Sequence, residues 1–177
     1  NVIALLLKRR APVNAISQSG TPLDLAKGYQ QPEAAALLQA KRGRAGREFS
    51  IHMAAAKGDA IAVQTFIRRG IKVNTPGPLH KSTPLHWAAG AGKVNTMETL
   101  ISLGADVDAL SDSNATPLHQ AVLQHRPEAV KLLIRNNADW NSQNKSGYTP
   151  LDYATANGRP DLAELLQTAG AVPGKSL

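Results

Sequence analysis

The chain has 177 residues, of which 42% are hydrophobic and 19% are charged, and its formal net charge is +7. This composition is typical of a globular chain with a buried core, and no run approaches the roughly 18 apolar residues of a membrane helix, so membrane insertion is not expected. Cysteine is absent, which excludes disulfides, thiolate metal ligands and a cysteine nucleophile.

The charge is unevenly distributed along the chain. Residues 1–88 carry 13 Lys and Arg against 4 Asp and Glu, whereas residues 89–177 carry 7 against 9. Such an asymmetry is typical of a surface that attracts nucleic acid or an acidic partner. Much of the excess lies at the ends of predicted helices, where cations interact favourably with the helix dipole.

Residues 1–43 are predicted to form a partial helical block. The chain opens at Asn1 within an apolar helical pattern, which indicates a segment of a longer polypeptide. Residues 1–20 supply half of a helix pair, and the stretch TPLDLAKGYQQPEAAALLQAKRG, from Thr21, supplies a complete pair. Its Asp24 and its Leu-Leu-Gln ending are shared with the last copy of the same pattern, which contains Asp152, so this pair is predicted to close a block.

Residues 44–48 are predicted to be a basic junction or a discontinuity. The next copy starts at Phe49, and the interval from Thr21 to Phe49 is shorter than the interval between any later copies. Either two arrays are therefore joined here or one array has a shortened or missing connection.

The surrounding cluster is denser in cations than a helix end requires, and Phe49 is its only nearby aromatic residue for stacking on bases. Binding to an acidic protein surface, or a role as a linker, is therefore favoured for this patch over nucleic-acid binding. The patch consists of Lys41, Arg42, Arg44 and Arg47.

From residue 49 to residue 171 the sequence repeats itself four times. Thr83, Thr116 and Thr149 stand at equal intervals, and FSIHMAAAKGD fits the same frame, with Phe49 at the Thr position and one extra residue in the loop before Thr83. A fixed period of about 33 residues indicates a stack of similar supersecondary units. Residues 172–177 are predicted to be a tail.

Each copy predicts the same succession of elements. A Thr N-cap and a Pro at the first helical position start a short helix, for example over 84–91. Gly92 makes a tight turn, and a longer helix over 93–103 has apolar residues at helical spacing, which predicts one buried face. Gly104 follows where a left-handed residue is favoured, and its counterparts are Gly70, Asn137 and Gly170.

The polar segment ADVDALSDSNA, which follows the second helix, is predicted to form an extended hairpin. Two short helices and a hairpin cannot bury an apolar face alone, so neighbouring copies must stack. The motifs TPLHWAA, TPLHQAV, TPLDYAT, LISLGADVDA and LLIRNNADWN, at this period, resemble the ankyrin repeat family. The resemblance implies an all-α solenoid, a curved slab of helix pairs with hairpin loops.

Residues that could carry catalysis or bind a metal are predicted to be structural. His52, His86 and His119 recur once per copy, and the resemblance implies that each holds its hairpin and the neighbouring repeat by hydrogen bonds, with the Thr as partner. Asp24 and Asp152 occupy the same motif position, which favours a capping role. No catalytic residue, cofactor or metal site is predicted, and the chain is not expected to be an enzyme.

The segment GAGK, over 90–93, is similar to the end of a phosphate-binding loop. No strand precedes it and Val94 stands where that loop needs Ser or Thr, so it is predicted to be an inter-helix turn.

The resemblance places partner binding on the concave face, formed by hairpin tips and first helices. Aromatic residues are over-represented among binding hot spots, which draws attention to Trp87, Tyr148 and Tyr153, whereas Trp140 is predicted to lie in the core. Small residues at Gly90 and Ala91 belong to the same face. The predicted positions are Leu79, His80, Ser82, Trp87, Asp112, Ser113, Ala115, Gln120, Leu123, Gln124, Lys145, Tyr148, Tyr153 and Asn157.

The function implied is non-catalytic protein–protein recognition by a chain that is monomeric in isolation. A regulatory or binding segment of a larger enzyme or transporter is the alternative. Nucleic-acid binding through the basic N-terminal half is a third and less favoured interpretation, which predicts steeply salt-dependent binding. The sequence identifies neither the partner nor the compartment.

Overall fold

The computed structural model describes residues 50–77 and 80–174. With the exception of Ser50, these belong to one compact unit, Ile51–Leu177. The predictions for residues 1–43, for the junction over 44–48 and for Asp24 therefore lie outside the described residues. Within the described part the secondary structure is entirely helical, which confirms the all-α prediction there. The helices are α4 (Ile51–Lys57), α5 (Ala60–Arg68), α6 (Pro84–Ala91), α7 (Val94–Ser102), α8 (Pro117–Leu123), α9 (Pro127–Arg135), α10 (Pro150–Ala156) and α11 (Pro160–Thr168).

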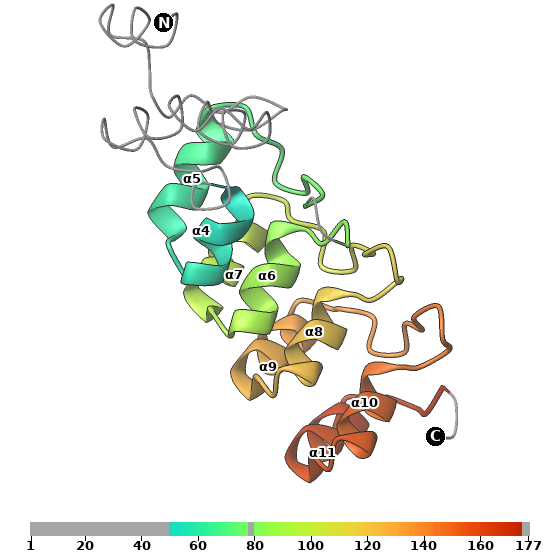
Figure 1. The fold of residues 1–177 in the computed structure, drawn as a ribbon. Coiled ribbons are helices and arrows are strands. Elements are labelled where there is room, and N and C mark those ends of the chain that lie inside the picture. The colour runs from blue at the N-terminus through green and yellow to red at the C-terminus, as the bar shows by residue number, and fades with distance from the viewer. Residues whose placement is uncertain (1–49, 78–79, 175–177) are drawn as a thin grey trace, which may run out of the picture. The chain divides into compact units, whose positions relative to one another are not determined.

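The helices are arranged as consecutive pairs stacked in two layers. The first helices α4, α6, α8 and α10 pack on one another in chain order, and the second helices α5, α7, α9 and α11 do the same behind them. Figure 1 shows the pairs following one another, with the long connecting loops all on the same side of the stack. None of the described helices has the length and apolar character needed to cross a membrane.

The Thr-Pro motif starts three of the first helices as predicted. Thr116 has an extended backbone (φ −90°, ψ 168°), and its side chain accepts a hydrogen bond from the backbone N–H of His119. His119 in turn accepts through Nδ1 from the N–H of Thr116, at 3.2 Å. This reciprocal pair is a capping box in which His replaces the usual Glu or Gln, and Asp152 has the same role beneath Thr149.

Small residues allow the first helices to approach closely. Ala88, Ala89, Ala121 and Ala154 are each completely buried, and the Leu that follows each Thr-Pro pair is also in the core. The second helices contribute the larger side chains at helical spacing, as at Met97 and Leu100. Because each pair leaves apolar surface on both sides, the core runs continuously from one pair to the next.

The residues predicted to end the second helices are in the left-handed region. Gly104 has φ +86°, and Asn137, the one non-glycine residue in the set, has φ +58°. Asn tolerates this conformation better than most residues because its short polar side chain bonds locally. The prediction is confirmed at all four positions, since Gly70 and Gly170 also have positive φ.

The loops close with backbone hydrogen bonds of the hairpin type, such as that from the N–H of Ser111 to the carbonyl oxygen of Ala115 at 3.0 Å, but they form no regular strand among the described residues. The described residues contain no strand, and the segment after α7 consists of turns. Side chains join these loops across successive repeats. The backbone N–H of Asp106 donates to Asn74 Oδ1 at 3.0 Å, and that of Asp139 donates to Asp108 Oδ1 at 2.9 Å. These Asx side chains therefore add contacts between repeats to the backbone hydrogen bonds that the loops also make.

The described part of the predicted tail is bound to the last repeat. The N–H of Val172 donates to Asn141 Oδ1 at 2.8 Å, which continues the Asx series, and the N–H of Gly174 donates to Asp152 Oδ2 at 3.1 Å. A Cβ at position 174 would lie 2.7 Å from the carbonyl oxygen of Gly147. This close approach shows that residues 172–174 pack against the array.

Candidate functional site

A hollow opens between the first helices and the loops that precede and follow them. It has a volume of about 650 Å³. The floor comes from α4, α6 and α8, and the wall comes from two successive loops, so three neighbouring repeats contribute to it. The residues around this first-helix hollow are Ala56, His80, Ser82, His86, Trp87, Gly90, Ala91, Ser111, Ser113, Gln120 and Gln124.

Trp87 is the largest side chain of the first-helix hollow. It lies in the middle of α6 and is half-buried. Its indole nitrogen, Nε1, is shielded from solvent and has no hydrogen-bond partner among the described residues. A buried N–H without an acceptor is unfavourable by about 1–3 kcal/mol, so this donor gains free energy from any acceptor that reaches it.

Two glutamines face Trp87's helix from the next repeat. Gln120 lies on α8 and Gln124 caps its end, one helical turn later. A Cβ placed on Gly90 would lie 3.7 Å from Gln124 Cγ and 3.8 Å from Gln120 Cβ. The absence of a side chain at Gly90 therefore leaves open the space beside the two glutamine side chains.

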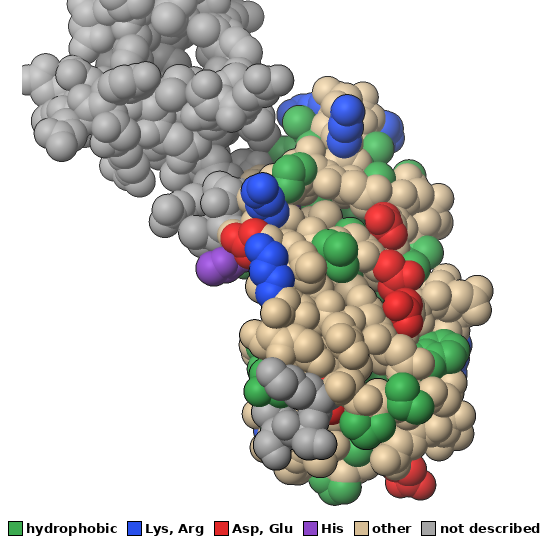
Figure 2. Space-filling view, turned by 90° about the vertical axis from the view of Figure 1, so that its right-hand side faces the viewer, with side chains coloured by type: hydrophobic (Ala, Val, Ile, Leu, Met, Phe, Trp, Pro, Cys, Tyr) green, Lys and Arg blue, Asp and Glu red, His purple; other side chains and the backbone are tan. Residues whose placement is uncertain are grey.

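The loop wall is fixed by contacts between its two segments. The N–H of Asp112 donates to the carbonyl oxygen of His80 at 2.9 Å, and their exposed side chains lie 3.7 Å apart, between Nδ1 and Oδ1. His80 and Lys81 both have positive φ, at 57° and 51°, which turns the loop back toward the helices. Figure 2, which views the molecule from the loop side, shows acidic side chains in a row across the loops.

A second cluster, of aromatic rings, lies in the last repeat. The rings of Tyr148 and Tyr153 have centroids 6.0 Å apart and meet edge to face, and His119 contacts Tyr153 in the same way at 6.0 Å. Asn144 Nδ2 donates to the hydroxyl of Tyr153 at 2.9 Å. Tyr153 is therefore held in place from two sides.

Six of the predicted partner-binding residues line the first-helix hollow, namely His80, Ser82, Trp87, Ser113, Gln120 and Gln124. The other predicted residues that the structure describes lie outside it. Ala115 is 7% exposed and its carbonyl oxygen accepts from His86, so its side chain belongs to the core. Trp140, predicted to be in the core, is half-buried, with its indole 3.7 Å from the position of a Cβ on Gly170. Asp112, Leu123, Lys145 and Asn157 are exposed outside the hollow. Leu79 and the basic patch Lys41, Arg42, Arg44 and Arg47 lie outside the described residues.

Three residues of the hollow, Ala56, His86 and Ser111, are absent from the predicted partner-binding face, and His86 was predicted to hold neighbouring repeats together. Ala56 occupies the position of Gly90 in the preceding copy, so extending the repeat frame one copy upstream would have found it. Ser111 is 6% exposed and its hydroxyl contacts that of Ser113 at 3.0 Å. No sequence signal identifies Ser111, because its place in the hollow depends on how the loop folds.

The recurring histidines His86 and His119 form hydrogen bonds both within their own repeat and to the next repeat. His86 contacts Thr83 Oγ1 through Nδ1 at 2.9 Å and the carbonyl oxygen of Ala115 through Nε2 at 2.9 Å. His119 repeats this with Thr116, at 2.9 Å, and with Tyr148, at 3.1 Å. The role implied by the resemblance is confirmed for these residues. Each Nδ1 accepts from the backbone N–H of the Thr, which assigns the ring proton to Nε2.

Burial keeps these imidazoles neutral. Desolvation lowers the pKa of His52, His86 and His119 below the ordinary value, although the carbonyl that each ring contacts opposes the shift. Both ring nitrogens of His86 and His119 are already engaged, so neither ring presents a free nitrogen to a substrate. Among the described residues there is no group of three or more His, Cys, Asp or Glu that could hold a metal ion.

A family model described as ankyrin repeats, in 3 copies, matches this chain over residues 51–144 and again over residues 104–175. Together they span the helices α4 to α11 and the loops between them.

Proposed function

Because the chain belongs to the ankyrin repeat family, whose members are generally protein–protein interaction modules and typically non-catalytic, we propose that it binds a protein partner in the first-helix hollow. The partner covers Trp87 and contacts the glutamines of α8 and the loop wall. The chain itself performs no chemistry in this proposal.

The unpartnered indole N–H of Trp87 is the observation that carries the proposal. Trp residues that combine a large apolar ring with a free donor are typical centres of binding hot spots. An acceptor of the partner, such as a backbone carbonyl, would satisfy Nε1 after a small side-chain movement. The gain would come on top of the apolar area that the ring buries.

The chemistry of the lining indicates what kind of segment the partner presents. In the described part of the chain the hollow is lined by small, hydroxyl, carboxamide, imidazole and indole side chains and by no Asp, Glu, Lys or Arg. Burying an unpaired charge of the partner here would be costly. Carboxamides such as Gln120 and Gln124 each offer a donor and an acceptor, which suits a peptide backbone or an amide side chain. We expect an uncharged, extended segment.

The first test replaces Trp87 and compares it with a distant apolar residue. Partners are captured with the wild-type chain, with Trp87→Ala and with Ile61→Ala, whose side chain is 75% exposed on α5, and the affinity of a purified partner is then measured. Trp87→Ala should weaken binding by about 2 kcal/mol, or roughly 30-fold, whereas Ile61→Ala should leave it unchanged. Equal affinity of all three proteins would refute the proposal.

A second variant separates binding from stability. Gly90 is within α6, and an added methyl group would make only ordinary contacts with the glutamines. Gly90→Ala should therefore stabilise the array by roughly 0.5–1 kcal/mol, because Ala favours the helix, and it should weaken partner binding by narrowing the hollow. Thermal melting and the same binding assay measure the two effects. A stabilised variant with undiminished affinity would place the partner elsewhere.

A further inference from the structure

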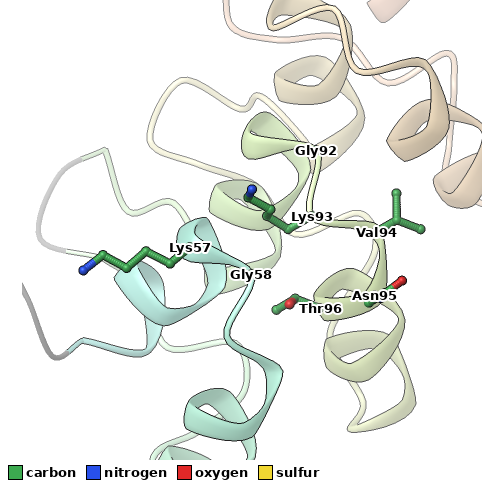
Figure 3. Close-up of a pocket in the computed structure, with 7 residues that line it drawn as sticks. All are labelled: Lys57, Gly58, Gly92, Lys93, Val94, Asn95 and Thr96. Carbon is green, nitrogen blue, oxygen red and sulfur yellow. The ribbon is translucent and has the colours of Figure 1, made fainter.

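A second hollow lies at the turns between first and second helices, at the ends of the helices that are remote from the long loops. It has a volume of about 380 Å³ and is lined by Lys57, Gly58, Gly92, Lys93, Val94, Asn95 and Thr96. Its lining comes from the inter-helix turns of two successive repeats and from the first turn of α7, as Figure 3 shows. We call it the α7 hollow.

The first turn of α7 presents uncompensated donors to the α7 hollow. Its N-cap is Lys93, which makes no side-chain capping bond, and the first turn has no acidic residue. The backbone N–H groups of Val94 and Asn95 have no acceptor among the described residues, as expected for a helix start without a cap. The positive end of the helix dipole lies at this point.

The other second helices compensate their N-termini in ways that α7 does not. On α5, Asp59 Oδ1 accepts from the N–H of Ala62 at 2.9 Å. The helices α9 and α11 both begin with Pro, which has no N–H to satisfy, and both carry an acidic residue in the first turn, Glu128 and Asp161. Within the described array, the need for a negative group is therefore specific to α7.

Thr96 points independently to a ligand in the α7 hollow. The residue is 1% exposed, and its hydroxyl has no hydrogen-bond partner among the described residues. Figure 3 shows its side chain directed from α7 toward the segment that follows Gly58. A buried hydroxyl without a partner is unfavourable in a folded protein, so an acceptor arriving in this hollow would satisfy it.

Two lysines, Lys57 and Lys93, line the same opening, and the side chain of Lys93 is directed toward α6 in Figure 3. Lys93 is exposed, and its Cδ lies 3.0 Å from the position of a Cβ on Gly58, so its stem crosses the turn of the preceding repeat. Lys57 extends away from α7 in Figure 3. No acidic residue is present among the described residues of the lining, and Asp59, the acidic residue next to it in sequence, is engaged with Ala62.

From these donors we propose that the α7 hollow binds a phosphate group, held by the N–H groups of Val94 and Asn95, the hydroxyl of Thr96 and the ammonium of Lys93. Phosphate oxygens accept several hydrogen bonds at once, and helix N-termini favour anions. The segment GAGK thus takes part in binding through its lysine alone, and Thr96 lies three residues after that lysine, whereas a phosphate loop carries Ser or Thr directly after it. The ligand is either free phosphate or a phosphorylated side chain.

The test is a titration of the full chain with inorganic phosphate at constant ionic strength, followed by the amide NMR signals of Val94, Asn95 and Thr96. We expect saturable shifts confined to this turn. Thr96→Val and Lys93→Gln should each weaken binding by about tenfold or more, because each removes a hydrogen bond to a charged group. The matched controls Thr99→Val, on the same helix, and Lys131→Gln, on α9, should bind as the wild type does.

The outcomes separate a site from general attraction of anions. Absence of saturable shifts, or equal affinity of the wild type and both variants, would overturn the proposal. Thr96→Val should melt at the wild-type temperature or above it, because the hydroxyl has no partner to lose, so a lower melting temperature would also count against it. A parallel titration with N-acetylphosphoserine amide identifies the source, since tighter binding than inorganic phosphate indicates a phosphorylated side chain.

Discussion

The inner repeats and the last repeat differ at the second residue after the Pro of the Thr-Pro motif. The residue there donates a hydrogen bond to the next repeat in the inner repeats, and it accepts one in the last repeat. In the inner repeats His86 and His119 reach forward to the carbonyl oxygens of Ala115 and Tyr148, so the ring donates to the next repeat. In the last repeat Asp152 accepts from the N–H of Gly174. Both residue types accept the N–H of the preceding Thr, so both cap their own helix.

This difference shows that the motif position of the last described repeat is satisfied by the short segment that follows α11. A donor at the motif position requires another loop whose carbonyl faces it, whereas a carboxylate accepts N–H groups from a short extended segment. Residues 172–174 supply such a segment, and no further helix pair is needed to satisfy the position. The change from His to Asp therefore converts a stacking contact into a closing contact.

The largest expected effect on stability comes from removing one of the histidines that link two inner repeats. His119→Ala leaves the N–H of Thr116 and the carbonyl oxygen of Tyr148 without their partner and opens a cavity, so the free energy of unfolding should fall by about 3 kcal/mol. Urea denaturation measures this change. His80→Asn, at an exposed histidine whose left-handed backbone (φ +57°) Asn tolerates, is the control and should have a much smaller effect. A similar loss of unfolding free energy in both variants would contradict the proposed role of His119 in linking the repeats.

Lowering the pH should destabilise the folded array through the same imidazole rings. Because burial lowers the pKa of His52, His86 and His119 in the folded protein, the unfolded chain binds protons more readily below its own histidine pKa of about 6.5. The stabilisation is therefore complete above about pH 6.5 and is lost as the pH falls below it, by at most about 1.4 kcal/mol per pH unit for each ring. Denaturation midpoints measured from pH 7.5 downward test this, and a flat profile to about pH 5 would show that the rings do not titrate as inferred.

A smaller effect is expected at the closing contact. Asp152→Asn preserves the shape of the side chain but replaces a charged acceptor by a neutral one, so the bonds from Thr149 and Gly174 weaken. The free energy of unfolding should decrease by about 1 kcal/mol, whereas Asp112→Asn, on an exposed loop, should leave it unchanged. If the two variants behave alike in chemical denaturation, Asp152 does not close the array.

Local rules account for the parts of the fold that the sequence predicts correctly. The Thr-Pro start and the Ala-rich run place α6 at Pro84–Ala91, as predicted. The second helix, predicted over 93–103, is one residue shorter at each end, because Lys93 and Leu103 have backbone angles outside the helical region. These end residues depend on the packing of the adjacent turns, which the local pattern does not report.

Some features of the candidate site also depend on local sequence, and others depend on packing between repeats. The sequence by itself determined the repeat, its caps, its left-handed turns and the exposure of one face, because each depends on residues within one period of the chain. Only the tertiary structure decided that Ala115 is buried, that Ser111 and Ala56 join the hollow and that Trp87 Nε1 and Thr96 Oγ1 lack partners among the described residues. Those outcomes depend on which atoms of one repeat meet the atoms of the next, and that register is set by packing across the stack.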